Sequence, residues 1–476
     1  MKKLFFTLAL ASMVYPALAN NDFQEEKKMI LSAITESEDE ATIQNISSNG
    51  LWAVGYSFDN SDNAAFNRNA SKWDLTKGER ILLVEDPTAQ SEANCINNDG
   101  TIVGGAYLNQ PAYNLNGEWH TLELPTGYTM GTVKDMTITP DGDTIFVGYV
   151  LDNAQAQAAE AAKWVNGVYE TANPRSLRYD KFDEPANVNT CYNISEDGKT
   201  ILGSLEFNAK PHQSAFIVTP DTAYLIDTET ESNRNMSFIF APRMSDNGKY
   251  VAGSFRKVVF NEGDEFSSVD IYQPCIFDVE KQRLQVLDCE FECGAWDVDN
   301  NGYVYVNSPV ETSPIRQAYI YKNNEWIEIE RIIRPAGIKQ SEIEAVANNY
   351  NEEGNDNLGT LLAVSADGKV IIGCAGECKT YNWVLAAATP LNEFETIEVS
   401  NNPISYDNLA AFYQNNTIIL SGMVDAIEVY DINGKMVMNQ MVESAFVPTQ
   451  LENGIYIVKI YNNKNNTICT SKIIVK

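Results

Sequence analysis

The chain has 476 residues, with 34 Lys and Arg against 65 Asp and Glu, so its formal net charge is −31 at pH 7. This balance argues against nucleic acid or an anionic membrane as a partner, because phosphate binding needs a basic surface. The acidity is typical of a soluble exported protein. Multivalent Ca²⁺ binding is the alternative that the acidity leaves open, and we expect no other cofactor.

The N-terminus has the three parts of a secretory signal peptide. Lys2 and Lys3 precede the apolar run Leu4–Val14, and Ala17-Leu18-Ala19 supplies a cleavage site of small residues. This order predicts a signal peptide over residues 1–19. No later stretch approaches 18 apolar residues, so we expect no transmembrane segment.

One short pattern then recurs seven times: an apolar residue, Ser, Thr, Asn or Asp, any residue, Asp or Asn, and Gly. The copies are Ile46–Gly50, Ile96–Gly100, Ile138–Gly142, Ile194–Gly198, Met244–Gly248, Val298–Gly302 and Val364–Gly368. Asp-Gly or Asn-Gly between two apolar runs predicts a β-hairpin turn. The run after most turns closes on a glycine, which indicates a close backbone approach or a bulge, whereas the sixth closes on Asn307.

An aromatic-rich hairpin follows each of these turns, so each period contains two hairpins and predicts a four-stranded antiparallel blade. We predict an all-β chain: a seven-bladed β-propeller followed by a small Ig-like β-sandwich. The propeller spans residues 20–397, with repeats over about 29–388 and a short linker. The last copy lacks a fourth strand. We expect Met29–Ile34 to supply it and so to close the ring.

A column of varied, mostly polar residues lies five positions before each turn glycine, on what we take to be the innermost strand. Its members are Asn45, Cys95, Thr137, Asn193, Arg243, Asp297 and Ala363. Polar residues around a central channel can form a ligand site, and Arg243 could clamp a carboxylate or phosphate. The candidate ligand-binding residues are therefore Arg243, Asp297, Asn193, Asn45 and Thr137. The alternative is that these side chains satisfy one another's hydrogen bonds.

The sequence has no clear catalytic signature. Its only two histidines, His120 and His212, weaken the case for Ser–His–Asp catalysis and for a histidine metal site. Asp297–Gly302 matches the first half of a calcium loop, but the twelfth position is Ser308 and not Glu, so a hairpin is favoured. Carboxylates at the channel mouth keep a glycoside hydrolase or lyase as the alternative function.

The eight cysteines include two pairs with three intervening residues, Cys289 with Cys293 and Cys374 with Cys378. Disulfides are favoured in an exported protein. Buried thiols and a zinc site built from both pairs stay open.

The combined repeat, Ile-Ser-x-Asp-Gly-x-x-Ile-x-Gly followed by Ala-Phe/Tyr, resembles the HAF-type extracellular repeats of bacteria. It is also similar to the repeats of TolB-like propellers, especially at Thr139–Gly142. The resemblance implies a propeller outside the cytoplasm and implies no particular activity.

The end of the chain carries more specific motifs, in Ile427–Lys435, Leu451–Lys459 and Lys472–Lys476. The residues that form them are Tyr430, Asp431, Gly434, Lys435, Gly454, Tyr456, Lys459 and Lys472. Residues 398–476 resemble the type A C-terminal (Por) sorting domain of the type IX secretion system. The resemblance implies an Ig-like β-sandwich, recognition by the outer-membrane export machinery, and a Bacteroidetes source. The protein would be secreted or at the cell surface, or periplasmic in a host without that system.

These observations favour an exported binding or interaction module over an enzyme. The expected ligand is a glycan, a peptide or a host protein. A structural surface protein without a small ligand is a further possibility.

Overall fold

A computed structural model describes residues 29–34, 41–58, 68–84, 86, 88–152, 159–172, 178–179, 184–185, 188–207, 210–226, 236–261, 264–289, 293–308, 317–322, 324–334, 336–347, 358–375, 381–387, 389–391, 410–414, 416–421, 424–432, 434–442, 446–462 and 467–475. The described residues up to 338, with 342–391, form one compact unit. Those from 410 onward form a second with 339–341. The predicted signal peptide lies outside the described residues.

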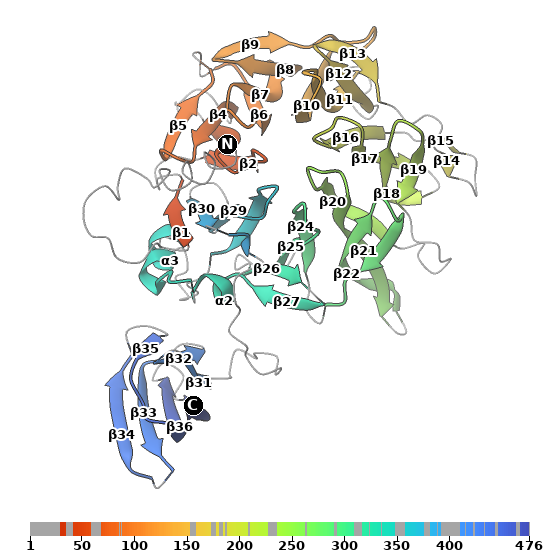
Figure 1. Cartoon of the computed structure of the whole chain (residues 1–476). Coiled ribbons are helices and arrows are strands. Elements are labelled where there is room, and N and C mark those ends of the chain that lie inside the picture. The colour runs from red at the N-terminus through yellow and green to blue at the C-terminus, as the bar shows by residue number, and fades with distance from the viewer. Residues whose placement is uncertain are drawn as a thin grey trace. The chain divides into compact units, whose positions relative to one another are not determined.

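The first unit is built from four-stranded antiparallel sheets, as the repeats predict, and we call each sheet a blade (Figure 1). Blade one contains β2 (Ala41–Ile46), β3 (Trp52–Phe58), β4 (Arg68–Asp74) and β5 (Glu79–Leu82), and blade two contains β6 (Ser91–Ile96), β7 (Ile102–Tyr107), β8 (Gln110–Leu115) and β9 (Glu118–Thr121). Blade three contains β10 (Met130–Ile138), β11 (Thr144–Leu151), β12 (Ala159–Val165) and β13 (Val168–Thr171), and blade four contains β16 (Val188–Ile194), β17 (Ile201–Phe207), β18 (Lys210–Val218) and β19 (Ala223–Ile226). Blade five contains β20 (Met236–Met244), β21 (Tyr250–Asn261), β22 (Asp264–Asp278) and β23 (Arg283–Val286), and blade six contains β24 (Gly294–Val298), β25 (Val304–Ser308), β26 (Gln317–Lys322) and β27 (Glu325–Glu328).

Blade seven joins the two ends of this unit. Its strands are β28 (Thr360–Val364), β29 (Val370–Ala375), β30 (Tyr381–Ala387) and β1 (Met29–Ala33). β1 pairs with β30, so that Met29 faces Ala387 and Ala33 faces Trp383. The prediction that the N-terminal segment supplies the missing strand is confirmed. This pairing covers the edge that blade seven would otherwise expose.

The innermost strands lie side by side in a closed ring, from β2 through β6, β10, β16, β20 and β24 to β28, which contacts β2 again (Figure 1). Apolar side chains fill each space between neighbouring blades. Trp73 of blade one, for example, packs with Val384 of blade seven, and Trp164 of blade three packs with Cys95 of blade two. Each blade therefore depends on its neighbours for a core, as a repeat architecture requires.

A bulge interrupts the pairing of each innermost strand with the next strand. The closing glycines lie against these bulges. A Cβ at Gly55 would stand 1.9 Å from the Thr42 carbonyl oxygen, and one at Gly148 would stand 2.0 Å from that of Thr132. The predicted close approach is thus confirmed. In blade six the buried Asn307 replaces the glycine and bonds both the N–H (2.9 Å) and the carbonyl (3.0 Å) of Leu361 in blade seven.

Three small elements lie outside the blades: the two-stranded sheet of β14 (Arg178–Tyr179) with β15 (Glu184–Pro185), and the helices α2 (Glu330–Ile333) and α3 (Gln340–Ala347). The helices lie between blades six and seven in the chain. Ile333 and Ile343 are buried in the same apolar cluster as Trp383, so this segment contributes to the core between those blades.

The second unit contains two antiparallel sheets. One has β31 (Ala410–Gln414), β32 (Thr417–Ser421) and β35 (Phe446–Pro448); the other has β34 (Met436–Met441), β33 (Ala426–Asp431), β36 (Gly454–Asn462) and β37 (Thr467–Val475). Ile418 and Val447 of the first sheet share one buried cluster with Val429, Val458 and Ile473 of the second. The two sheets therefore pack on one common apolar core.

Candidate functional site

The five candidate residues, Asn45, Thr137, Asn193, Arg243 and Asp297, all line one cavity of about 360 Å³ inside the ring of innermost strands. Four of them directly follow the bulge of their strand. In blade three that position belongs to Asp135, and Thr137 lies two residues further on. The reason is a longer hairpin, in which Ile138 pairs with Thr144. The six-residue spacing from Gly142 to Gly148, against five from Gly198 to Gly203, is the sequence signal for this shift.

The side chains after the bulge bond a row of backbone N–H groups. Three of these bonds cross to the next blade: the Ile194 N–H donates to Asp135 Oδ2 (3.0 Å), the Met244 N–H to Asn193 Oδ1 (3.3 Å) and the Val364 N–H to Asp297 Oδ2 (2.9 Å).

The other three bonds are local. The Ile46 N–H donates to Asn45 Oδ1 (2.9 Å), the Met136 N–H to Asp135 Oδ1 (2.8 Å) and the Val298 N–H to Asp297 Oδ1 (2.9 Å). In each case the preceding blade has a residue without a side-chain oxygen at the equivalent position: Ala363, Cys95 or Arg243. Since a buried N–H needs an acceptor, the local residue supplies it.

The number of N–H groups that each side chain bonds explains why asparagine and aspartate alternate along Asn45, Asp135, Asn193 and Asp297. Asp135 and Asp297 each serve their own blade and the next one, which takes two acceptor oxygens and therefore a carboxylate. Asn193 needs only one acceptor, because the Ile194 N–H is already bonded by Asp135. The alternative prediction is that the column's side chains satisfy one another's hydrogen bonds. The side-chain oxygens of Asn45, Asn193 and Asp297 instead accept backbone N–H groups.

Arg243 differs from the rest of the column. A guanidinium has only donors, so it cannot bond a strand N–H. In the part of the chain that the structure describes, it makes no hydrogen bond or ion pair, although its charge acts on Asp297. Its five N–H donors therefore remain available to a ligand in the cavity.

Burial raises the pKa of the cavity carboxyls. The pKa of Asp135 rises to about 7 and that of Asp297 to about 6, although their N–H donors, and at Asp297 also Arg243, oppose the effect of burial. Burial raises the pKa of Asp246 as well, although the hydrogen bond with the Ser48 hydroxyl acts to lower it. Burial thus brings the titration of Asp135 and Asp297 closer to neutral pH.

Sequence reasoning missed Asp135, Glu196 and Asp246 as cavity residues. Glu196 and Asp246 occupy the unspecified position of the turn motif, which carries no pattern of its own. Neighbouring turns bond one another there, for example the Glu196 N–H to the Asp246 carbonyl at 2.6 Å. In these two turns the variable position therefore borders the cavity.

The metal and calcium alternatives stay predictions. Among the described residues, no group of three or more His, Cys, Asp or Glu side chains could hold a metal ion. Asp299 accepts the N–H groups of Asn301 (2.8 Å) and Tyr303 (3.1 Å), so Asp297–Gly302 forms the predicted hairpin turn. Calcium binding elsewhere stays a prediction. His120 stacks on Tyr113 in blade two, away from the cavity, and the side chain of His212 lies outside the described residues.

The cysteines divide into several kinds. Cys95, Cys191 and Cys275 are buried free thiols, and burial raises the pKa of each. Cys374 is in a disulfide. The Sγ atoms of Cys289 and Cys293 lie 2.7 Å apart. Cys378 is outside the described residues.

The C-terminal motif residues occupy defined positions in the second unit. Tyr430 donates to Glu428 (2.6 Å), and Lys459 lies over its ring. Asp431 accepts the Lys435 N–H through Oδ1 (2.9 Å), in a turn where Gly434 has φ of +80°. The other four lie on strands β36 and β37: Gly454, Tyr456, Lys459 and Lys472. The Tyr456 hydroxyl donates to the Glu452 carbonyl (2.9 Å).

Residues 411–476 match a protein family described as "Secretion system C-terminal sorting domain". The second unit is a type IX sorting domain. It marks the protein as secreted or displayed on the cell surface and implies contact with the type IX machinery. Among the described residues, no helix is long and apolar enough to span a bilayer.

Several solved structures resemble part of the chain at low identity, whereas no curated protein matches it. An oligogalacturonate lyase from Vibrio parahaemolyticus matches with a TM-score of 0.49 and 10% identity, over 75% of this chain and 93% of the lyase. TolB from Acinetobacter baumannii has a TM-score of 0.35 and 12% identity, over 58% and 62%.

PorZ, a surface component of the type IX secretion system of Porphyromonas gingivalis, has a TM-score of 0.38 and 12% identity. That match covers 91% of this chain and 59% of PorZ. These likenesses assign no activity to this protein.

Proposed function

We propose that this protein is an exported seven-bladed β-propeller with an Ig-like sorting domain, and that its channel binds a small polar ligand or the end of a glycan or peptide. The observation that carries this proposal is Arg243, whose donors the ring does not use. The cavity volume of about 360 Å³ is at the small end of the range typical of ligand pockets, about 300–1,000 Å³.

The polar lining favours a ligand rich in hydroxyl, amine or carboxylate groups over an apolar one. Asn45, Asn98, Glu196 and Asp246 all border the cavity, and each can hydrogen-bond a polar guest. The cavity size argues against a folded partner inside the channel. A protein or long glycan would bind there only through one terminal group.

A glycan and peptide array probed with the full chain tests this function. We expect saturable retention of at least one ligand, with no released product. Loss of retention on Asp246→Ala would map the binding to the cavity and not to the sorting domain. An array with no retained ligand would contradict the proposal and favour a structural role.

A carboxylate-dependent hydrolase or lyase is the second candidate. It is favoured by Asp135 and Asp297, whose raised pKa values would allow proton transfer near neutral pH. Against it, both oxygens of each carboxyl already accept strand N–H groups. Product released from the array glycans, lost on Asp297→Asn, would support this second function over simple binding.

A further inference from the structure

The ring of hairpin turns is interrupted between blades two and three. At each of the other six junctions, a hydrogen bond joins the end of one hairpin to the turn of its neighbour. The Asn49 N–H, for example, donates to Asn98 Oδ1 (2.9 Å) between blades one and two. The structure describes all seven turns, and among these residues no hydrogen bond joins 96–101 of blade two to 136–144 of blade three. The turns of these two blades are therefore not tied to each other.

The turn glycines mark the same interruption. Six of them lie against the preceding blade: a Cβ on Gly100 would stand 2.3 Å from Trp52 of blade one, and a Cβ on Gly198 would stand 2.8 Å from Thr139 of blade three. A Cβ on Gly142 of blade three would have no atom within 4 Å. The turn of blade three is thus the one of the seven with open space on the side of the preceding blade.

The longer hairpin of blade three accounts for the interruption. After the bulge, two residues of blade two pair with the next strand, Cys95 and Ile96, whereas four do so in blade three, Asp135–Ile138. The extra pairs carry the turn of blade three beyond the level of the turn before it. Pro140 also occupies the turn position at which Glu196 of blade four donates its N–H to the next turn, and proline has no N–H.

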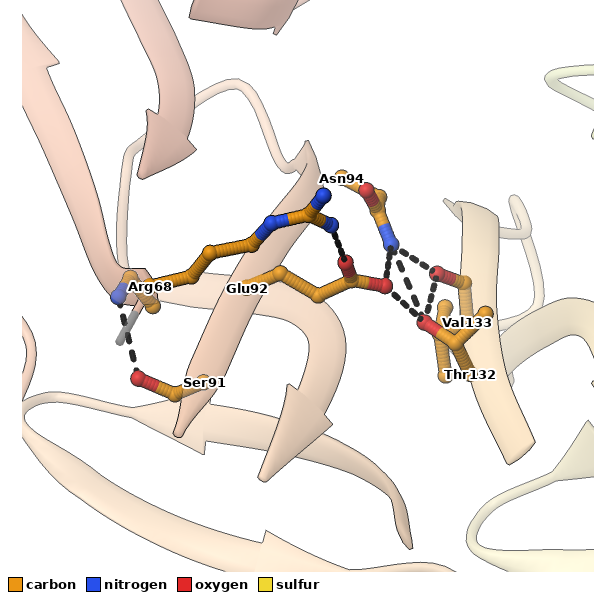
Figure 2. Close-up of polar contacts among 7 residues, drawn as sticks. Arg68, Ser91, Glu92, Asn94, Thr132 and Val133 are labelled. Carbon is orange, nitrogen blue, oxygen red and sulfur yellow. Dashed lines mark hydrogen bonds and ion pairs between the residues drawn. The ribbon is translucent and has the colours of Figure 1, made fainter. Parts of the chain in front are cut away.

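Before the bulge the same two blades are joined directly. Figure 2 shows Glu92 and Asn94 of blade two beside Thr132 and Val133 of blade three. The Thr132 hydroxyl donates to Glu92 Oε1 (2.9 Å), and the Asn94 amide donates to the Val133 carbonyl (2.8 Å). Arg68 of blade one donates to Glu92 Oε2 (3.5 Å). The interruption is therefore confined to the turn end of the junction, where the cavity lies.

Polar and apolar side chains flank this opening. Asn97, Asn98 and Asp99 border the cavity from blade two, and Ile138 borders it from blade three. Ile138 is 43% exposed, whereas the apolar residue that begins the turn motif is at most 8% exposed in each of the other six blades. Asn98 Oδ1 accepts the Asn49 N–H, but no described residue accepts a hydrogen bond from the Asn98 amide nitrogen. The opening therefore offers an apolar contact and unused amide donors.

We propose that the channel ligand is the carboxyl end of a peptide whose chain leaves the cavity between the turns of blades two and three. This inference rests on the proposed binding function and specifies the ligand. A peptide has a carbonyl on every residue and can carry apolar side chains, which suits the Asn98 amide donors and Ile138. A glycan has hydroxyl groups on most ring carbons and would cover Ile138 with less apolar surface. The terminal carboxylate pairs with the unused donors of Arg243 in the same cavity.

Fluorescence polarisation of the full chain with three probe sets tests this inference. The first set contains tetrapeptides with a free carboxyl end and a label on the amino end, with Leu or Ser fixed at one position at a time. The second contains the same peptides with an amidated end, and the third contains neutral and acidic tetrasaccharides. We expect the first set to bind, with Leu favoured over Ser at one position. The amidated peptides should bind at least about tenfold more weakly, because they cannot form a charge-assisted pair with Arg243.

Ile138→Ser tests the apolar contact. It should weaken binding of the Leu peptides about fivefold and remove their advantage over the Ser peptides. Leu115→Ser changes a side chain of similar exposure (38%) that does not border the cavity, and it should leave binding unchanged. Melting curves identify any variant that fails to fold.

Asn98→Asp tests the amide donors. It keeps the acceptor for the Asn49 N–H and removes the side-chain N–H groups, so peptide binding should weaken about fivefold or more. Asn300→Asp is the matched control. Asn300 accepts the Asn247 N–H at the equivalent position of blade six and does not border the cavity, so this variant should bind peptides as the wild type does.

Peptide binding that is unchanged by both Ile138→Ser and Asn98→Asp would overturn the inference. Stronger binding of the tetrasaccharides than of the peptides would overturn it too, but would leave the proposed binding function intact. Equal binding of the free and amidated peptides would overturn the assignment of the carboxyl end. Absence of binding for every probe set, together with an empty array, would overturn both the inference and the proposed function.

Discussion

Blades three and five place opposite chemistry at the same point of one repeat. After the bulge, blade three has Asp135, whose two oxygens accept the N–H groups of Met136 and Ile194 and so tie blade three to blade four. Blade five has Arg243, which can only donate and which bonds no described residue. The same backbone position therefore serves the ring when its side chain accepts hydrogen bonds, and is free for a ligand when it only donates.

The consequence of Arg243 appears in the next blade. Because Arg243 cannot accept the Val298 N–H, Asp297 does so with Oδ1 while its Oδ2 accepts the Val364 N–H. An aspartate thus compensates for the arginine before it. The comparison teaches that a polar residue in a channel is assigned to structure or to binding only after every nearby backbone group is counted.

The largest effect is expected from removing a double acceptor. Asp297→Ala leaves the Val298 and Val364 N–H groups without their acceptors, at about 1–3 kcal/mol for each buried group. We therefore expect the free energy of unfolding, measured by urea denaturation, to fall by more than about 2 kcal/mol. Thr137→Ala, which removes only one hydroxyl bond to the Glu196 carbonyl, is the matched control and should cost less. Equal losses for the two variants would refute the double-acceptor role.

A graded pair of changes at Asp135 sharpens the same point. Asp135→Asn keeps one acceptor oxygen and orphans one N–H group, whereas Asp135→Ala orphans two. The alanine variant should lose about twice as much unfolding free energy as the asparagine variant, which should lose about 1–3 kcal/mol. If Asp135→Asn is as stable as the wild type, one carboxyl oxygen is dispensable, and the need for two acceptors does not explain the aspartate at this position.

The pH dependence of stability should also change at Asp135. Its folded pKa of about 7 lies above the ordinary aspartate value, so the folded state binds more protons than the unfolded state between about pH 4 and 7. This carboxyl therefore makes the unfolding free energy decrease as pH rises through that window. Asp135→Asn should make the decrease between about pH 5 and pH 7 shallower than in the wild type. An unchanged slope would mean that Asp135 does not titrate there.

The smallest effect on stability is expected at Arg243. Arg243→Gln removes no hydrogen bond or ion pair to any described residue, so the unfolding free energy should change by no more than about 0.5 kcal/mol. Urea denaturation at pH 7 checks this. A loss of unfolding free energy above about 2 kcal/mol would show that Arg243 supports the ring, as Asp135 does.

The sequence alone determined the features that depend on local pattern. Each Asp-Gly or Asn-Gly turn specified a hairpin, the closing glycines marked the bulges, and the missing strand after Val384–Ala387 pointed to Met29–Ile34. The motifs around Tyr430 and Gly454 identified the sorting domain, because they lie within single hairpins where order and spacing carry the information.

Only the tertiary structure decided which residue follows the bulge in blade three and what each side chain does there. Counting from Gly142 selected Thr137, because a longer hairpin shifts the register and no short motif records it. The partner of Asp135 is the N–H of Ile194, 59 residues away, and that of Asp297 is the N–H of Val364, 67 residues away. A bond between blades depends on how two sheets pack, and this packing separates the structural carboxyls from the available Arg243.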